Sequence, residues 1–325
     1  MVKIDILMDL NKWKVASEEQ QNGIINHLLS KLEKEFELSY IKSYGKKGDT
    51  TRIATFKQKA TGILFNLIPG GKFQMGFSTS EEQALRQIKP KDSGLGGGSF
   101  TLKDKNGKEI ESGTIEPNIE QEFIEEYLEN VESMQPVHEV ILAPFLILRF
   151  PIMLDEVKKL ITIDEEGNRL ETGQAALFFD EIDELLEKTG CSLPSEAQWE
   201  YSCRGGTKTI FFWGNTIPDG SEWIGTYDDD KKNEEYSNGF GLVDMGAFSE
   251  VCDDKWHPNY KNAPIDGSSW SGDSQNQIVR GGAANIYPWQ DCGEWLLMIS
   301  ANRGTDVEWE YGFNIRLVKN LNDIL

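Results

Sequence analysis

The sequence lacks the residue patterns that would assign it directly to a common functional class. Its 325 residues include 3 histidines and 4 cysteines. The cysteines stand at 191, 203, 252 and 292, which leaves no Cys-x-x-Cys pair and excludes a zinc knuckle or a disulfide framework. The longest apolar stretch, residues 140–154, is interrupted by Pro144, Arg149 and Pro151, so we expect no membrane-spanning segment.

Positive charge is also scarce. There are 33 lysines and arginines against 54 aspartates and glutamates, a formal net charge of −21. Such a surface repels phosphate backbones and anionic lipid headgroups, so neither nucleic acid nor a membrane is an expected partner. Residues 1–17 contain no apolar core of a signal peptide. We therefore expect an acidic cytoplasmic protein with free thiols and no disulfide.

The chain divides into a short N-terminal part and a long remainder. Residues 1–45 are predicted to be helical, because a capping box at Ser17 and Gln20 precedes apolar residues at helical spacing. This helix is expected to pack on the rest of the chain through Ile25, Leu28, Leu32 and Phe36. The turn-like residues 45–50 suggest a boundary. We predict an N-terminal helical extension over 1–50 and one domain over 51–325, with an insertion at about 88–134 that contains an acidic amphipathic helix.

Beyond residue 52 the pattern becomes that of short strands and turns. Residues 63–76 alternate around a turn at 69–71, and residues 138–154 predict a buried strand pair that leads into a helix. Two further helices are expected: one ends at Gly190, and the next begins after Pro194, where Ser195 and Gln198 form a capping box.

An ordered set of motifs resembles one family. The stretches LIPGGKFQMG (67–76), PVHEVILAPFLI (136–147), LPSEAQWEY with the following RGG (193–206), FFWG (211–214), VRGGA (279–283) and GFNIRLV (312–318) resemble the formylglycine-generating enzymes, or sulfatase-modifying factors. The resemblance implies an α+β fold of the C-type lectin-like type, with little regular secondary structure, a twisted antiparallel sheet and two main helices. It also implies that the first and last strands of the domain pair.

The resemblance further implies roles for residues around the central helix. Trp199, Trp213 and Trp256 are expected in the core, where a large aromatic side chain stabilises most. Four charged residues are expected to be buried polar partners that need pairing: Glu196, Glu200, Arg204 and Arg303.

The family's chemistry needs residues that this chain does not supply in the expected places. Its enzymes oxidise a substrate cysteine with copper and dioxygen, using two closely spaced cysteines after a Gly-Gly, because Cu(I) prefers thiolates. Here Ala283 and Ala284 follow the glycines, and Cys292 stands alone in the loop. Cys252 is a second ligand only if the fold brings it near. A calcium site is similarly reduced, since Ala247 replaces an expected asparagine and leaves Glu250 as a candidate ligand.

The stretch 286–297 gathers the remaining candidate residues. It contains Tyr287, Trp289, Asp291, Cys292, Glu294 and Trp295, either as an aromatic cover over the core or as an apolar, carboxylate-rimmed slot for a ligand. Three functions stay open. The first is a non-catalytic module that needs no cofactor and binds a peptide, a protein or a small molecule through residues 283–297. The second is a copper- or iron-dependent oxidoreductase with Cys292 as its catalytic residue. The third is a structural or interaction protein.

Overall fold

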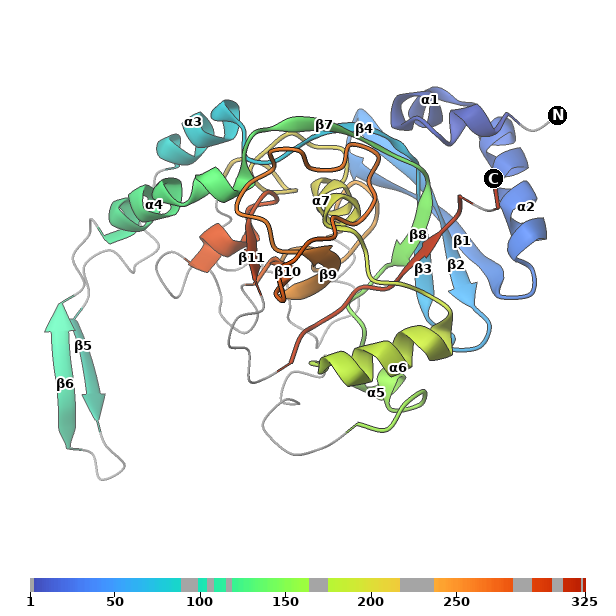
Figure 1. Ribbon diagram of the computed structural model, residues 1–325. Helices are drawn as coiled ribbons and strands as arrows, with labels where there is room; N and C mark the ends of the chain where they lie inside the picture. The colour runs from blue at the N-terminus through green and yellow to red at the C-terminus, as the bar shows by residue number, and fades with distance from the viewer. Residues whose placement is uncertain are drawn as a thin grey trace.

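The computed structural model describes residues 3–88, 99–103, 108–114, 119–163, 175–216, 237–282, 294–305, 312–322 and 324–325. Short helices and strands occur in runs along these residues, with strands in succession between residues 36 and 75 and helices between residues 154 and 204 (Figure 1). All pairings between their named strands are antiparallel. The predicted α+β class, with antiparallel sheets and limited regular structure, is confirmed.

The N-terminal helices pack as predicted. A 3₁₀ turn, η1 (Ile4–Ile6), precedes α1 (Leu10–Val15) and α2 (Glu18–Leu32). The capping box forms, with the Ser17 side chain accepting from the Gln20 amide and the Gln20 side chain accepting from the Ser17 amide. These bonds satisfy amides that no helical carbonyl reaches. The predicted packing residues are all buried in one cluster with the strands: Ile25, Leu28, Leu32 and Phe36.

The helical prediction for residues 1–45 is wrong beyond α2. Residues 36–46 form β1 (Phe36–Lys46), which pairs with β2 (Asp49–Gln58) around a tight turn. Pairing with β2 across this turn makes residues 36–46 a strand, and the hydrogen bonds of the ladder outweigh local helix propensity. The boundary predicted at residue 50 falls within this hairpin.

The hairpin belongs to a five-stranded sheet in the order β1-β2-β3-β8-β12. Its other members are β3 (Leu64–Ile68), β8 (Phe145–Leu148) and β12 (Val318–Asn320). The prediction that the first and last strands of the domain pair is wrong, because β8 lies between β3 and β12. All four residues of β8 are buried, and a strand buried on both faces is best placed inside a sheet.

Smaller sheets complete the strand pairings. The turn at residues 69–71 joins β3 to β4 (Gly71–Met75), and β4 pairs with β7 (His138–Leu142). The predicted strands β7 and β8 both form, but each pairs in a different sheet. A three-stranded sheet has the order β11-β10-β9 and consists of β9 (Glu250–Lys255), β10 (Gln277–Arg280) and β11 (Arg303–Thr305).

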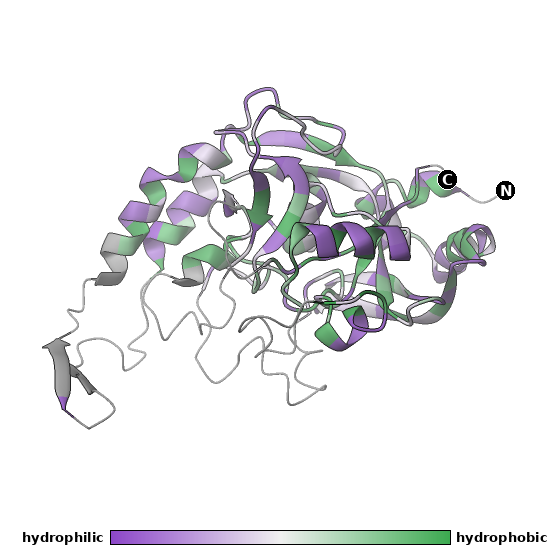
Figure 2. Ribbon diagram, turned by 60° about the horizontal axis from the view of Figure 1, so that its bottom comes forward, coloured by the Kyte–Doolittle hydropathy of each residue, from purple (hydrophilic) through white to green (hydrophobic). Residues whose placement is uncertain are grey.

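The helix α3 (Thr79–Gln87) directly precedes the predicted insertion. Within the insertion lie the hairpin strands β5 (Ser99–Lys103) and β6 (Glu109–Thr114), α4 (Ile119–Glu129) and the 3₁₀ turn η2 (Val131–Met134). Arg86 joins α3 to α4 through an ion pair of 2.8 Å with Glu125. The predicted acidic amphipathic helix is confirmed as α4, since Ile124 is buried while Glu125 and Glu126 are exposed. Hydrophilic and hydrophobic residues both occur along these helices (Figure 2).

The later helices begin and end where the sequence predicts. A short α5 (Leu154–Val157) precedes α6 (Phe179–Thr189) and α7 (Glu196–Arg204). Gly190 ends α6 with φ of 63°, a left-handed conformation that glycine adopts without strain. The capping box of Ser195 and Gln198 starts α7. In the part of the chain that is described, no helix has the length and apolar character needed to span a membrane.

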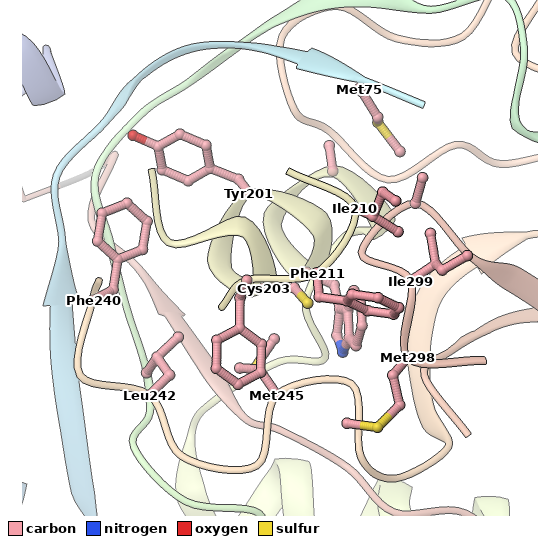
Figure 3. Packing of buried hydrophobic residues seen from close by; sticks show 14 of the residues in the cluster. Met75, Tyr201, Cys203, Ile210, Phe211, Phe240, Leu242, Met245, Met298 and Ile299 are labelled. Atoms are coloured by element: carbon pink, nitrogen blue, oxygen red, sulfur yellow. The ribbon is translucent and has the colours of Figure 1, made fainter. Parts of the chain in front are cut away.

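Buried apolar residues form two clusters, one on each face of the five-stranded sheet. In β8, Phe145 and Ile147 belong to one cluster, and Leu146 and Leu148 belong to the other, as expected for side chains that alternate across a strand. The first cluster surrounds α7, where Tyr201 and Cys203 face apolar side chains from distant segments (Figure 3). This packing makes α7 the central post of the molecule.

Candidate functional site

The centre of the candidate site is α7, which carries charged side chains into the core. All nine of its residues are buried, so no solvent is available to its ionised groups. Buried charges are tolerated when they are paired and hydrogen-bonded. Trp199 is fully buried as predicted, while Trp213 and Trp256 are half-buried at the edge of the same cluster.

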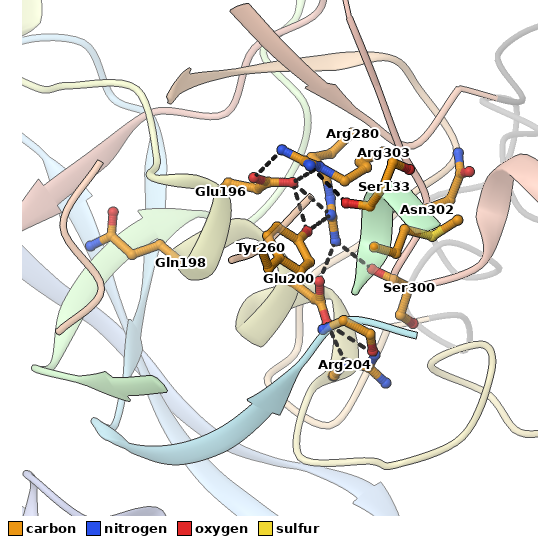
Figure 4. A network of polar contacts seen from close by, with 12 residues as sticks. Ser133, Glu196, Gln198, Glu200, Arg204, Tyr260, Arg280, Ser300, Asn302 and Arg303 are labelled. Atoms are coloured by element: carbon orange, nitrogen blue, oxygen red, sulfur yellow. Dashed lines mark hydrogen bonds and ion pairs between the residues drawn. The ribbon is translucent and has the colours of Figure 1, made fainter. Parts of the chain in front are cut away.

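Glu196, in the first turn of α7, binds two arginines at once (Figure 4). Arg303 donates from Nε and Nη2 to the two carboxylate oxygens at 2.7 and 3.0 Å. Arg280 donates from Nη1 at 2.9 Å, and the Tyr260 hydroxyl donates at 2.9 Å. A bidentate arginine–carboxylate pair is the strongest geometry available to these groups. The predicted role of Glu196 and Arg303 as buried polar partners is confirmed.

Glu200, one turn further along α7, binds Arg204 and also Arg280, which thus joins the two carboxylates. Arg204 donates to its Oε1 at 2.9 Å, and Arg280 donates to its Oε2 at 2.7 Å. The Gly76 amide also donates to Oε1. Burial opposes the charged form of Glu200, but Arg204 and Arg280 outweigh it and hold its pKa below the usual range. Arg204 in turn binds Glu81 of α3 at 2.9 Å.

These groups form a charge-balanced set, which we call the α7 ion network. It contains three carboxylates and three guanidinium groups, each no more than 6% exposed: Glu81, Glu196, Glu200, Arg204, Arg280 and Arg303. Equal numbers of opposite charges leave no net charge to desolvate.

Three residues of this network and its partners were not predicted from the sequence motifs: Arg280, Tyr260 and Glu81. A signal existed for Arg280, which stands directly before the Gly-Gly of the family motif. A sequence signal also existed for Glu81, because it lies three residues after Ser78 and completes a capping box. Tyr260 had none, since its hydroxyl reaches Glu196 from a loop 64 residues away.

The α7 ion network lies at the base of the predicted binding loop. Arg280 is the last residue of β10, and its Nη2 donates to the Ser300 carbonyl at 2.8 Å. The chain from 283 to 293 lies outside the described residues, and with it lie four predicted site residues: Tyr287, Trp289, Asp291 and Cys292. Glu294 and Trp295 begin the 3₁₀ turn η3 (Glu294–Met298), but their side chains are not described.

Glu250, the candidate calcium ligand, is fully buried in β9 and occupied by other partners. Arg316 donates from Nε to both of its oxygens at 3.0 and 3.2 Å, and the Trp199 indole N–H donates to Oε2 at 2.6 Å. The structure therefore shows Glu250 as an ion-pair partner. Within the described ranges, no group of three or more His, Cys, Asp or Glu side chains could hold a metal ion.

Three of the four cysteines are described, and each carries a free thiol. Burial raises the pKa of Cys191 to about 11 and that of Cys203 to about 12. Burial, followed by the nearby Asp254 carboxylate, raises the pKa of Cys252 well above its usual value. Because the thiolate is the metal ligand and nucleophile, these raised pKa values lower the reactivity of the three thiols at neutral pH.

Asp254 joins the start of α7 to a neighbouring loop. Its two carboxylate oxygens accept from the Glu196 amide at 2.7 Å and from the Trp270 amide at 2.8 Å. Burial, and then the Glu196 carboxylate, raise its pKa to about 7. The folded state therefore binds this proton more tightly than the unfolded chain, where an aspartate has a pKa of about 3.9.

This raised pKa predicts a pH dependence of stability. The contribution of Asp254 is fully present below about pH 4 and is lost as pH rises to about 7, at up to about 1.4 kcal/mol per pH unit. We expect the free energy of unfolding of the wild type, minus that of Asp254→Asn, to fall by about 2.6 kcal/mol between pH 5 and pH 8. Urea unfolding across this range measures it, and parallel curves for the two proteins would contradict it.

Comparisons with known proteins match part of this chain. The model of the sulfatase-modifying factor enzyme 1-like domain family matches residues 178–306, which include α6, α7 and the β9–β11 sheet. The formylglycine-generating enzyme of Mycobacterium tuberculosis is 30% identical over 95 residues, which cover 23% of this chain and 31% of that enzyme. The match thus spans less than a third of that enzyme's length.

Two solved structures are similar over most of the chain. The structure of PvdO from Pseudomonas aeruginosa is 20% identical, covers 82% of this chain and 98% of its own, and has a TM-score of 0.49. Treponema denticola variable protein 1 is 12% identical, covers 86% and 99%, and has a TM-score of 0.45. The family match agrees with the motifs around α7, β10 and β11, and residues 178–306 of this chain are similar to the formylglycine-generating enzyme-like domain.

Proposed function

We propose that this protein is a non-catalytic member of its family that binds a peptide, a protein or a small molecule through residues 283–297. The observation that carries the proposal is the number, position and protonation state of the cysteine thiols. Cys292 is the one cysteine of the loop, and Cys191, Cys203 and Cys252 are held as protonated thiols in the described structure. Cys292 therefore has no second thiolate among these cysteines with which to form a copper site.

The copper chemistry that the family implies does not fit these residues. Two thiolates hold Cu(I) because soft ligands match a soft ion, and much of the affinity depends on the second one. Cys252, the candidate second ligand, is fully buried in β9 between Val251 and Asp253. Its raised pKa keeps it protonated at neutral pH. This donor set therefore does not supply a two-thiolate copper site.

The same loop is well suited to recognition. It carries three large aromatic residues, Tyr287, Trp289 and Trp295, beside Asp291 and Glu294. Aromatic faces bind cations and apolar groups, and carboxylates at the rim add charge selection. A loop of this composition on a rigid scaffold favours an amphipathic or cationic ligand. The three free thiols support a reducing, cytoplasmic setting for this binding.

The proposal predicts that the protein does not generate formylglycine. Purified protein incubated with copper, dioxygen and a sulfatase-type cysteine peptide should give no aldehyde product by mass spectrometry. Metal analysis of the same protein should show no stoichiometric copper or iron. Turnover or bound metal that disappears in Cys292→Ser would contradict the proposal and support an oxidoreductase.

Selection from a peptide library tests whether residues 283–297 bind a ligand. A phage library of amphipathic, cationic peptides is selected on the wild type and on a triple variant with Tyr287, Trp289 and Trp295 replaced by alanine. We expect enriched peptides to bind the wild type and to lose at least about tenfold in affinity on the triple variant, since aromatic anchors dominate such contacts. Trp213→Ala is the matched control, with an aromatic residue removed outside the loop. Peptides that bind all three proteins equally, or no enrichment, would reject the proposal.

A further inference from the structure

We propose that the outer edge of β1 is a docking site for an extended, acidic segment of another protein, which adds to the five-stranded sheet as a further strand. The inference goes beyond the proposed function. It uses no residue of 283–297, and it concerns a part of the chain outside residues 178–306, which match the family. Figure 1 shows the β1–β2 hairpin on the side of the molecule that carries α1 and α2.

The first observation is that β1 is an edge strand. It stands at the end of the strand order β1-β2-β3-β8-β12. Within the described ranges, no backbone hydrogen bond joins residues 36–46 to a segment other than β2. In an antiparallel pair, every second residue of a strand directs its N–H and C=O groups away from the partner. These groups of β1 are therefore placed to pair with an added strand.

The second observation is the length and exposure of this edge. After one register shift near its start, β1 pairs with β2 through seven consecutive residues, Tyr40 to Lys46. Seven residues of extended strand span about 23 Å. Ser43, Gly45 and Lys46 are exposed, so solvent reaches this part of β1. The helix α2 packs on a face of the sheet, because its apolar residues belong to the buried cluster on that face.

The third observation is a reversal of charge. Residues 40–59 contain six lysines and arginines and one aspartate, a net charge of +5, whereas the other residues contain 27 and 53 charges of the two signs, a net charge of −26. Lys46 and Lys47 at the turn and Lys57 and Lys59 near the end of β2 are all exposed. A basic hairpin on an acidic protein attracts acidic partners and repels basic ones.

The same lysines distinguish between possible occupants of the edge. Two copies of β1 paired with each other bring like charges together, which destabilises cross-strand pairs, and lysine on an edge strand is a common protection against self-association. A nucleic acid extends beyond the hairpin and meets the negative charge of the remaining surface. A short acidic strand contacts the hairpin alone and gains opposite-charge pairs there.

Fluorescence anisotropy with the full chain tests the proposal. The probe is a labelled ten-residue peptide of alternating glutamate and threonine. The control peptide has the same sequence with N-methyl groups on all its central backbone amides, which removes hydrogen-bond donors and keeps the charge. We expect the first peptide to bind and the control peptide to bind at least about tenfold more weakly, because strand addition depends on main-chain hydrogen bonds.

Two double variants of the protein test where the peptide binds. Lys46→Glu/Lys47→Glu reverses the charge at the end of β1, and Lys208→Glu/Lys261→Glu makes the same change in net charge at exposed lysines outside residues 40–59. We expect the first to weaken binding at least about tenfold and the second by less than about twofold, because nearby charges act most strongly.

Three results would overturn the proposal. The first is the absence of binding by the acidic peptide, or equal binding of the N-methylated control. The second is an equal loss in the two double variants, because binding would then follow net charge alone. The third is a wild-type dimer in sedimentation that dissociates in Lys46→Glu/Lys47→Glu, because a second copy would then occupy the edge. The selection on residues 283–297 uses cationic peptides, so its outcome is separate.

Discussion

Glu196→Gln is expected to lower the free energy of unfolding by about 3–5 kcal/mol, a large part of the stability of an ordinary domain. Glu196 accepts from Arg280, Arg303 and Tyr260, and it is 2% exposed. The amide removes one negative charge from the α7 ion network, so three guanidinium groups face two carboxylates. It also turns an N–H donor toward an arginine. An unpaired charge in the core destabilises the folded state, because it has lost its hydration without gaining an ionic partner.

Chemical denaturation measures this effect, with Glu139→Gln as the control. Glu139 pairs with Lys72 at 3.0 Å, but both side chains are about half exposed or more. Exposed ion pairs contribute little, so the control should change stability by less than about 0.5 kcal/mol. A loss of under about 1 kcal/mol for Glu196→Gln would show that the network is not a major source of stability.

The second large effect is expected for Trp199→Ala, which should cost about 3–5 kcal/mol. Trp199 is fully buried in the cluster around α7, and its indole N–H donates to Glu250 at 2.6 Å. Alanine leaves a cavity and removes a donor from a buried carboxylate, and both changes destabilise. Trp199→Phe fills most of the cavity and still loses the donor, so its cost should be smaller.

Trp213→Ala provides the matched comparison. Trp213 stacks on Phe211 with ring centroids 4.6 Å apart, but it is only half-buried. Its loss should cost about 1 kcal/mol, because less apolar area returns to water. Equal losses for the two tryptophans, measured by thermal unfolding, would contradict the assignment of Trp199 as the central post.

Local features of this chain were predictable from the sequence. Capping boxes at Ser17 and Ser195 and the glycine at 190 mark helix ends, because these side chains and this backbone conformation act on amides within a few residues. Burial of Glu196, Glu200, Arg204 and Arg303 followed from the family motifs. The roles of the individual carboxylates and arginines did not.

Strand pairing was harder to predict for a physical reason. Residues 36–46 follow a helical segment, and only β2 across the turn makes them a strand. Likewise β8 separates β3 from β12, although 76 residues lie between the end of β3 at 68 and the start of β8 at 145. Pairing free energy depends on neighbours that a local pattern does not contain.

By itself, the sequence determined the composition of the candidate site: one cysteine in the loop, alanines after the glycines, and aromatic residues beside carboxylates. Tertiary structure alone decided what surrounds them. It brought Arg280, Arg303 and Tyr260 to one carboxylate and sealed Cys252 in the core. It also placed Glu250 in an ion pair with Arg316. Ionic pairing and burial are properties of distances in space, and residues 20 to 107 positions apart in the chain meet there only because the strands and α7 pack together.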